Sequence, residues 1–105
     1  MGRVFQVTVT APSDEVAAQL GRRVVEDRLA ACAQVGGPVA STYWWEGEVQ
    51  QATEWTLVCK TSEARLDALV ATVREAHPYD TPEIVATPVT GDGAYLAWVE
   101  AATAG

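Results

Sequence analysis

The most informative segment of the chain is VASTYWWEGEVQQATEWTLVCK, residues 39–60. Residues 39–45 and 49–60 are rich in β-branched and aromatic side chains that alternate with polar ones, which is typical of strands. Between these runs, Glu46-Gly47-Glu48 is a short turn with glycine at its centre, and such a turn favours a β-hairpin. The segment therefore predicts two antiparallel strands that are adjacent in the sequence.

The hairpin extends toward the N-terminus, because residues 33–35 also have a strand-like pattern. Gly36-Gly37-Pro38 interrupts the run and predicts a bulge or a kink. Two strands of about ten residues reach about 33 Å, whereas the other strand-like runs, 3–10 and 82–89, are shorter. We therefore expect part of the hairpin to extend past the rest of the sheet, with backbone N–H and C=O groups left unpaired.

Three aromatic residues, Tyr43, Trp44 and Trp45, lie close to the hairpin turn. Trp44 and Trp45 are neighbours in a strand, so their side chains face opposite sides; we expect one in the chain's own core and the other against a neighbouring subunit. Exposed aromatic strand edges aggregate unless they are covered. A second copy of the chain is the simplest cover, and closed symmetry keeps such an assembly finite. The hairpin thus predicts a homo-oligomer with these three residues at its interface.

The rest of the chain supplies one strand and one helix before the hairpin, and a helix, a strand and a closing helix after it. Ser13 is a good N-cap for the first helix, and His77-Pro78 ends the second, because a residue before proline resists the α conformation. This βαββαβ order with an additional C-terminal helix is typical of the ferredoxin-like α+β fold, in which both crossover helices lie on one face of a four-stranded antiparallel sheet. The predicted elements are strands 3–10, 33–45, 49–60 and 82–89, and helices 14–29, 61–77 and 94–102.

Composition and charge exclude several classes of function. A chain of 105 residues has room for a single hydrophobic core, so we assign residues 1–105 to one domain. The formal charge of −7 opposes binding to nucleic acid, which needs clustered Lys and Arg. No run reaches the ~18 apolar residues of a membrane helix, and we expect no secretory signal. Together with two cysteines expected to be reduced and buried, these features predict a cytoplasmic protein.

Seven short blocks stand out along nearly the whole chain. They are Thr10-Ala11-Pro12, Leu29-Ala30-Ala31-Cys32, Tyr43-Trp44-Trp45-Glu46-Gly47, Lys60-Thr61, His77-Pro78-Tyr79, Pro82-Glu83-Ile84 and Tyr95-Leu96-Ala97-Trp98. In this order they resemble the CutA family of divalent-cation tolerance proteins. The resemblance implies a PII-like homotrimer, whose hairpins add strands to neighbouring sheets, and a role in the tolerance of copper and other divalent ions. No GxSxG, P-loop, GxGxxG or HExxH motif is present, so we expect a protein that is not an enzyme.

The same resemblance implies copper ligands, which this chain matches only in part. In the family, copper binding is associated with a cysteine near the end of the first strand, here Val9, and with adjacent histidines, here Ala76-His77. His77 is then a metal ligand, or a helix C-terminal residue that interacts with the last carbonyl groups. Cys32 is the second candidate ligand, or a small buried apolar residue like Cys59. Copper or another divalent cation should bind weakly, since a tight site needs three or four ligands, and folding should require no metal.

Lys60 and Glu83 stand at strand ends and form the last candidate site. As an acid–base pair they would bind a polar ligand in a cleft; alternatively, they form a structural ion pair at a subunit boundary. Tyr79, Tyr95 and Trp98 would line the same region, or pack in the core or the interface. These residues support an alternative function, that of a PII-like trimeric signalling or scaffold protein that binds a small ligand or a partner protein in inter-subunit clefts. A purely structural trimer is the third hypothesis.

Overall fold

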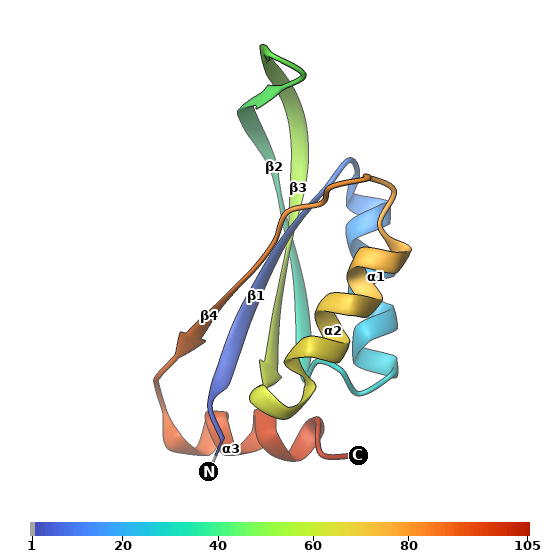
Figure 1. The fold of residues 1–105 in the computed structure, drawn as a ribbon. Helices are drawn as coiled ribbons and strands as arrows, with labels where there is room; N and C mark the ends of the chain where they lie inside the picture. Colours follow the sequence, from blue (N-terminus) through green and yellow to red (C-terminus); the bar gives the residue numbers. More distant parts are fainter. Residues whose placement is uncertain (1) are drawn as a thin grey trace.

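The computed structural model describes residues 2–105, which form a four-stranded antiparallel sheet and three helices (Figure 1). The strands lie in the order β2-β3-β1-β4. Helices α1 and α2 lie on one face of the sheet, and α3 lies at the end farthest from the hairpin tip (Figure 1). The predicted α+β order of elements is thereby confirmed. The elements are β1 (Val4–Ala11), α1 (Asp14–Glu26), β2 (Cys32–Trp45), β3 (Glu48–Ser62), α2 (Glu63–Ala76), β4 (Ile84–Val89) and α3 (Gly93–Ala102).

The core lies between the sheet and the two helices that cover it. Because side chains alternate along a strand, every second residue of the central strands β1 and β3 points toward these helices. Gly21 of α1 allows a close approach, since a Cβ atom there would lie only 2.9 Å from Leu57 Cδ1. Within residues 2–105, none of the helices is long and apolar enough to cross a membrane. The buried core residues include Val7, Val9, Leu20, Val24, Leu57, Cys59, Leu69 and Val73.

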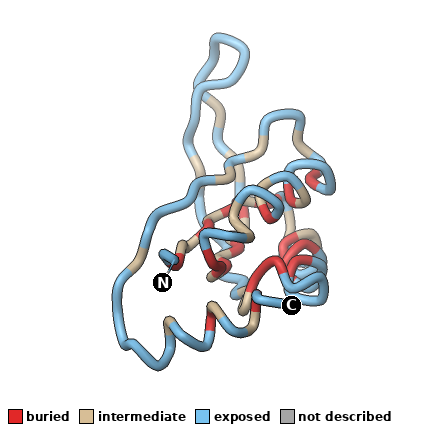
Figure 2. Tube along the Cα trace, turned by 60° about the horizontal axis from the view of Figure 1, so that its bottom comes forward, coloured by how far each residue is buried: buried red, intermediate tan, exposed pale blue. Residues whose placement is uncertain are grey.

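Strands β2 and β3 form a hairpin that extends well past the other strands, as predicted (Figure 1). β3 pairs with β1 only over residues 55–62, whereas residues 48–54 pair with β2 alone. The chain is therefore elongated, with extents of 44 × 24 × 21 Å, and Figure 2 shows the projecting part of the hairpin as largely exposed. Trp44 is 74% exposed and Trp45 47% exposed. The prediction that one of them enters the core is wrong. Both lie on the part of β2 whose partner residues in β3 have no β1 strand on their other side.

Glycines shape the two irregular points of the hairpin. At the tip, Glu46 and Gly47 have φ angles of 52° and 78°, and two consecutive positive φ values are typical of the two-residue type I′ turn that suits the twist of a hairpin. The turn is thus one residue shorter than predicted, and Glu48 already belongs to β3. Lower down, the β2–β3 register shifts between Gly36 and Val39, which confirms the predicted bulge.

The first helix ends three residues earlier than predicted. α1 ends at Glu26, and Arg28 has a φ angle of 58°, which is a left-handed conformation usually occupied by glycine after a helix. The N–H groups of Leu29 and Ala30 both donate to the carbonyl oxygen of Val24, so the last turn of the helix is capped by its own backbone. The sequence pattern does not indicate that the helix ends here, because the expected stop signal is glycine and this position is an arginine.

Replacing Gly37 by alanine should destabilise the fold. Gly37 has a φ angle of +123°, and a Cβ atom there would lie 3.0 Å from Trp55 Cδ1 and 3.2 Å from the carbonyl oxygen of Glu54. We expect Gly37→Ala to lower the free energy of unfolding by about 1–3 kcal/mol, measured by guanidinium denaturation at a fixed protein concentration. Gly91→Ala is the control, since no atom lies within 4 Å of its Cβ position. Equal losses in both variants would contradict the argument.

Candidate functional site

The predicted cleft residues lie toward two ends of the sheet, and the fold of the chain does not bring them all together. Tyr95 and Trp98 belong to α3, and Lys60 lies near that end of β3, whereas Glu83 lies beside the hairpin. Across the sheet, Lys60 aligns with Thr87 of β4, four positions after Glu83, and four strand residues span about 13 Å. Lys60 and Glu83 therefore form no ion pair within residues 2–105. A pair between them would need two subunits.

Near α3, the structure gathers the candidate ligand Cys32 with the other predicted cleft residues. Cys32 pairs directly with Lys60 across β2 and β3, so the two side chains share a face. The Cys32 Sγ atom lies 3.5 Å from the hydroxyl oxygen of Tyr95, and this hydrogen bond, more than burial, raises the pKa of Tyr95. The rings of Tyr95 and Trp98 are tilted against each other with centroids 5.6 Å apart. The group is therefore a thiol hydrogen-bonded to Tyr95, which contacts Trp98, with Lys60 opposite the thiol in the strand pairing.

The second thiol, Cys59, belongs to the core. It pairs in register with Ala33, the residue after Cys32, so the two cysteines point to opposite faces of the sheet and both are free. Burial, followed by the nearby Cys32, raises the pKa of Cys59 to about 12, while Lys60 opposes the shift. Cys59 is thus an inert apolar residue. Cys32 is only partly buried, which departs from the expectation that both thiols are buried.

The side chain of His77 links the segment that follows α2 to the end of β1 through hydrogen bonds. Its side chain is 7% exposed. The ring Nε2 atom lies 2.7 Å from the carbonyl oxygen of Thr10, to which it donates, and Nδ1 accepts a hydrogen bond of 3.1 Å from the backbone N–H of Tyr79. His77 caps α2 through its backbone N–H, which donates to Val73, but its ring crosses to β1 instead of reaching the last helix carbonyls. A metal ion at His77 would have to displace one of these two bonds.

A groove lies between the hairpin and the segment that follows His77. On its wall, the Tyr79 hydroxyl donates a 3.1 Å hydrogen bond to Glu54 Oε2, and Glu54 is only 8% exposed. Burial, followed by the contact with Glu54, raises the pKa of Tyr79 to about 12, so the phenol remains a hydrogen-bond donor at neutral pH. The groove has a volume of about 610 Å³ and is lined by Thr10, Ser41, Thr42, Tyr43, Trp44, Trp45, Glu54, Tyr79, Asp80, Thr81 and Glu83.

Sequence reasoning missed Glu54, the most buried acidic residue of this groove. A glutamate between Thr53 and Trp55 in an alternating strand is typical of a solvent-facing position. It accepts a hydrogen bond from Tyr79, which lies 25 residues later in the chain, and no local pattern reports such a contact. Within residues 2–105, no group of three or more His, Cys, Asp or Glu side chains is arranged to hold a metal ion.

The sheet order, the helices on one face and the projecting hairpin define a small α+β protein of ferredoxin-like topology. Residues 5–102 match the family of the CutA1 divalent ion tolerance protein. The chain belongs to this family, which confirms the resemblance seen in the sequence blocks.

Relatives from plants and bacteria support the assignment. The chain is 41% identical over 98 residues to "Protein CutA 1, chloroplastic" of Oryza sativa subsp. japonica, which covers 92% of the chain and 55% of the relative. It is 38% identical over 96 residues to the divalent-cation tolerance protein CutA of Pectobacterium atrosepticum, covering 90% of the chain and 87% of the relative. The solved divalent cation tolerance protein of Thermus thermophilus superposes with a TM-score of 0.92 at 40% identity, covering 95% of this chain and 98% of that one. The chain thus spans about half the length of the rice relative.

The two thiols should differ in reactivity. We expect a disulfide reagent at pH 8 to label Cys32 in the native protein and to spare Cys59, because burial raises the pKa of Cys59 to about 12 and the thiolate is the reactive form. Mass spectrometry should find one label per native chain and two after denaturation. Cys32→Ser should remove the native label, whereas the matched control Cys59→Ala should keep it. Native labelling of Cys59 would contradict this assignment.

Proposed function

We propose that the chain forms a homotrimer that contributes to the tolerance of divalent cations, copper among them, without acting as an enzyme. Membership of the family supports the link to divalent cations. The observation that carries the assembly is the projecting hairpin, on which Tyr43, Trp44 and Trp45 are 42%, 74% and 47% exposed. Clustered aromatic side chains on a strand edge favour association, because water solvates them poorly.

The sheet also offers two edges for association. β2 and β4 are the outer strands, so each has one row of backbone groups without a strand partner in the subunit. β2 is 14 residues long, and a long flat edge is a template for pairing with another chain. A closed ring in which the hairpin of one subunit continues the sheet of the next would satisfy both edges. It would also cover the exposed apolar side chains on these two strands, namely Val35, Val39 and Val85.

Metal binding in this proposal is weak and is not required for folding. His77 already uses both ring nitrogens in hydrogen bonds, and within residues 2–105 the half-buried Cys32 belongs to no group of three or more His, Cys, Asp or Glu side chains that could hold a metal ion. A thiolate is a soft ligand that suits copper in its reduced form. A single thiol gives a weak site, so any tighter one would draw ligands from more than one subunit.

The proposal also includes the cellular compartment in which the protein is located. Two free thiols, one of them partly exposed, are typical of a reducing environment. The proposed location is therefore the cytoplasm.

Light scattering tests the assembly. We expect the wild-type protein to have the mass of three subunits at low micromolar concentration, because the hairpin aromatics lie at subunit contacts. The double variant Trp44→Glu/Trp45→Glu should shift the mass toward one subunit, since two buried charges at an interface are costly. Val25→Glu is the matched control, because Val25 is also an exposed apolar residue but lies on α1. A well-folded wild-type monomer would overturn the proposed trimer.

Calorimetric titration with copper tests the proposed metal binding and its candidate ligands. We expect weak binding that becomes about tenfold weaker in Cys32→Ser and in His77→Gln, since each removes a candidate ligand. Cys59→Ala is the control and should bind like the wild type, because Cys59 is buried on the opposite face of the sheet. Thermal melting of the metal-free protein should show a folded state. Unchanged affinity in both variants would remove Cys32 and His77 as ligands.

A further inference from the structure

The closing helix α3 is held to the rest of the chain mainly at its C-terminal end. Val99 in its last part and Thr103 just after it are buried, and the Thr103 hydroxyl lies in a buried contact with the end of β3. The first three residues of the helix are exposed, and the Tyr95 hydroxyl is joined to Cys32 by a hydrogen bond of 3.5 Å. We propose that two arginines of the same chain anchor α3 at its C-terminal end, and that the helix opens as a unit and thereby controls access to Cys32. The proposal goes beyond divalent-cation tolerance and rests neither on it nor on the trimer.

The anchor consists of two guanidinium groups that come from different elements. Arg28, which follows α1, donates a hydrogen bond of 3.0 Å from Nη1 to the carbonyl oxygen of Ala102. Arg65 of α2 donates one of 2.9 Å from Nε to the next carbonyl oxygen, that of Thr103. The last carbonyl groups of a helix carry a partial negative charge, so positive groups are favourable there. Because the last turn of α3 contains no basic residue of its own, these two arginines supply that charge from outside the helix.

The strongest observation is the backbone conformation of Arg28. Its φ angle of 58° is one that glycine adopts at lower cost. The residue after it fixes this conformation, because the N–H group of Leu29 donates to Val24 and the carbonyl oxygen of Leu29 accepts a hydrogen bond of 2.6 Å from the Thr61 hydroxyl. The contact with Ala102 thus gives a physical reason for an arginine at a position that suits glycine.

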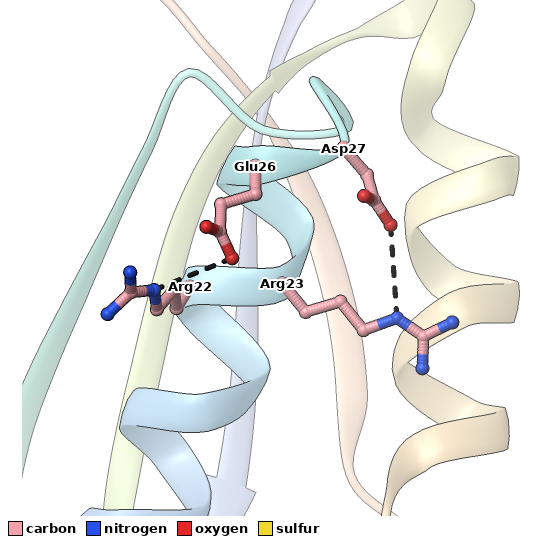
Figure 3. Close-up of polar contacts among 4 residues, drawn as sticks. All are labelled: Arg22, Arg23, Glu26 and Asp27. Carbon is pink, nitrogen blue, oxygen red and sulfur yellow. Dashed lines mark ion pairs between the residues drawn. The ribbon is translucent and has the colours of Figure 1, made fainter.

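The neighbouring arginines of α1 make no such link. Arg22 and Arg23 pair with Glu26 and Asp27, which lie four residues further along the same chain segment (Figure 3). Exposed pairs of this kind contribute little to stability. Replacing Arg22 and Arg23 therefore removes the same charge as replacing the two anchoring arginines, but leaves the contacts of α3 intact.

The connection between β4 and α3 leaves the helix room to move. Gly91 and Gly93 flank the N-cap residue Asp92, and no atom of a more distant residue lies within 4 Å of the Cβ position of either glycine. Asp92 accepts a hydrogen bond of 3.0 Å from the backbone N–H of Tyr95, so this cap belongs to the helix and moves with it. Elements with few buried apolar contacts open at a lower free energy than the core. Opening of α3 takes the Tyr95 hydroxyl away from Cys32.

Peptide-resolved hydrogen exchange tests whether α3 opens by itself. In the wild-type protein we expect the amides of α3 to exchange about tenfold faster than those of β1, or faster still, because β1 exchanges only when the core opens. The double variant Arg28→Met/Arg65→Met keeps the apolar stems and removes the charged donors, so exchange in α3 should become about tenfold faster again. Arg22→Met/Arg23→Met is the matched control and should leave exchange in α3 within about twofold of wild type.

The labelling rate of Cys32 reports the same opening at a second place. With a disulfide reagent we expect this rate to rise about fivefold in Arg28→Met/Arg65→Met, since the thiol loses its contact with Tyr95 and becomes more accessible. If the double variant does not fold, Arg28→Met alone changes an exposed side chain and should raise both rates by a smaller factor.

Three results would overturn the proposal. Equal exchange of α3 and β1 in the wild type would mean that the helix opens only together with the core. Exchange in α3 that the anchor variants leave unchanged would mean that other packing, such as that against a second copy, holds the helix. Faster exchange in α3 without faster labelling of Cys32 would mean that the helix does not control access to the thiol.

Discussion

The pairing of β3 with β1 and β2 is the constraint on which the other features depend. After Trp55, β3 has a strand on each side and presents Leu57 and Cys59 to the helices. Between the hairpin turn and Trp55, β1 has ended and β3 has only β2 as a neighbour. The part of the hairpin nearest its turn therefore cannot be covered by the chain's own helices, whatever side chains it carries. Core, projecting hairpin and groove all follow from where β1 stops.

Much of the fold was predictable because it is local. Alternating apolar residues, the glycine of the hairpin turn and the Gly36-Gly37-Pro38 interruption predicted the elements, their order and the bulge. The errors fall where local pattern and tertiary context disagree. The end of α1 was misplaced because Arg28 adopts a conformation usually reserved for glycine. One tryptophan was assigned to the core because strand alternation gives the face of a side chain but not how far the sheet beneath it extends.

The candidate site was predictable only in its parts. The sequence blocks pointed to Cys32, Lys60 and Tyr95, which the fold does bring together. The expected partner of Lys60, the carboxylate of Glu83, lies four strand positions away because the β1–β4 register aligns Lys60 with Thr87. Glu54 could not be found from the sequence pattern, since its hydrogen-bond partner is a tyrosine in a distant segment. His77 was ambiguous for the same reason: only the fold shows that both ring nitrogens have partners.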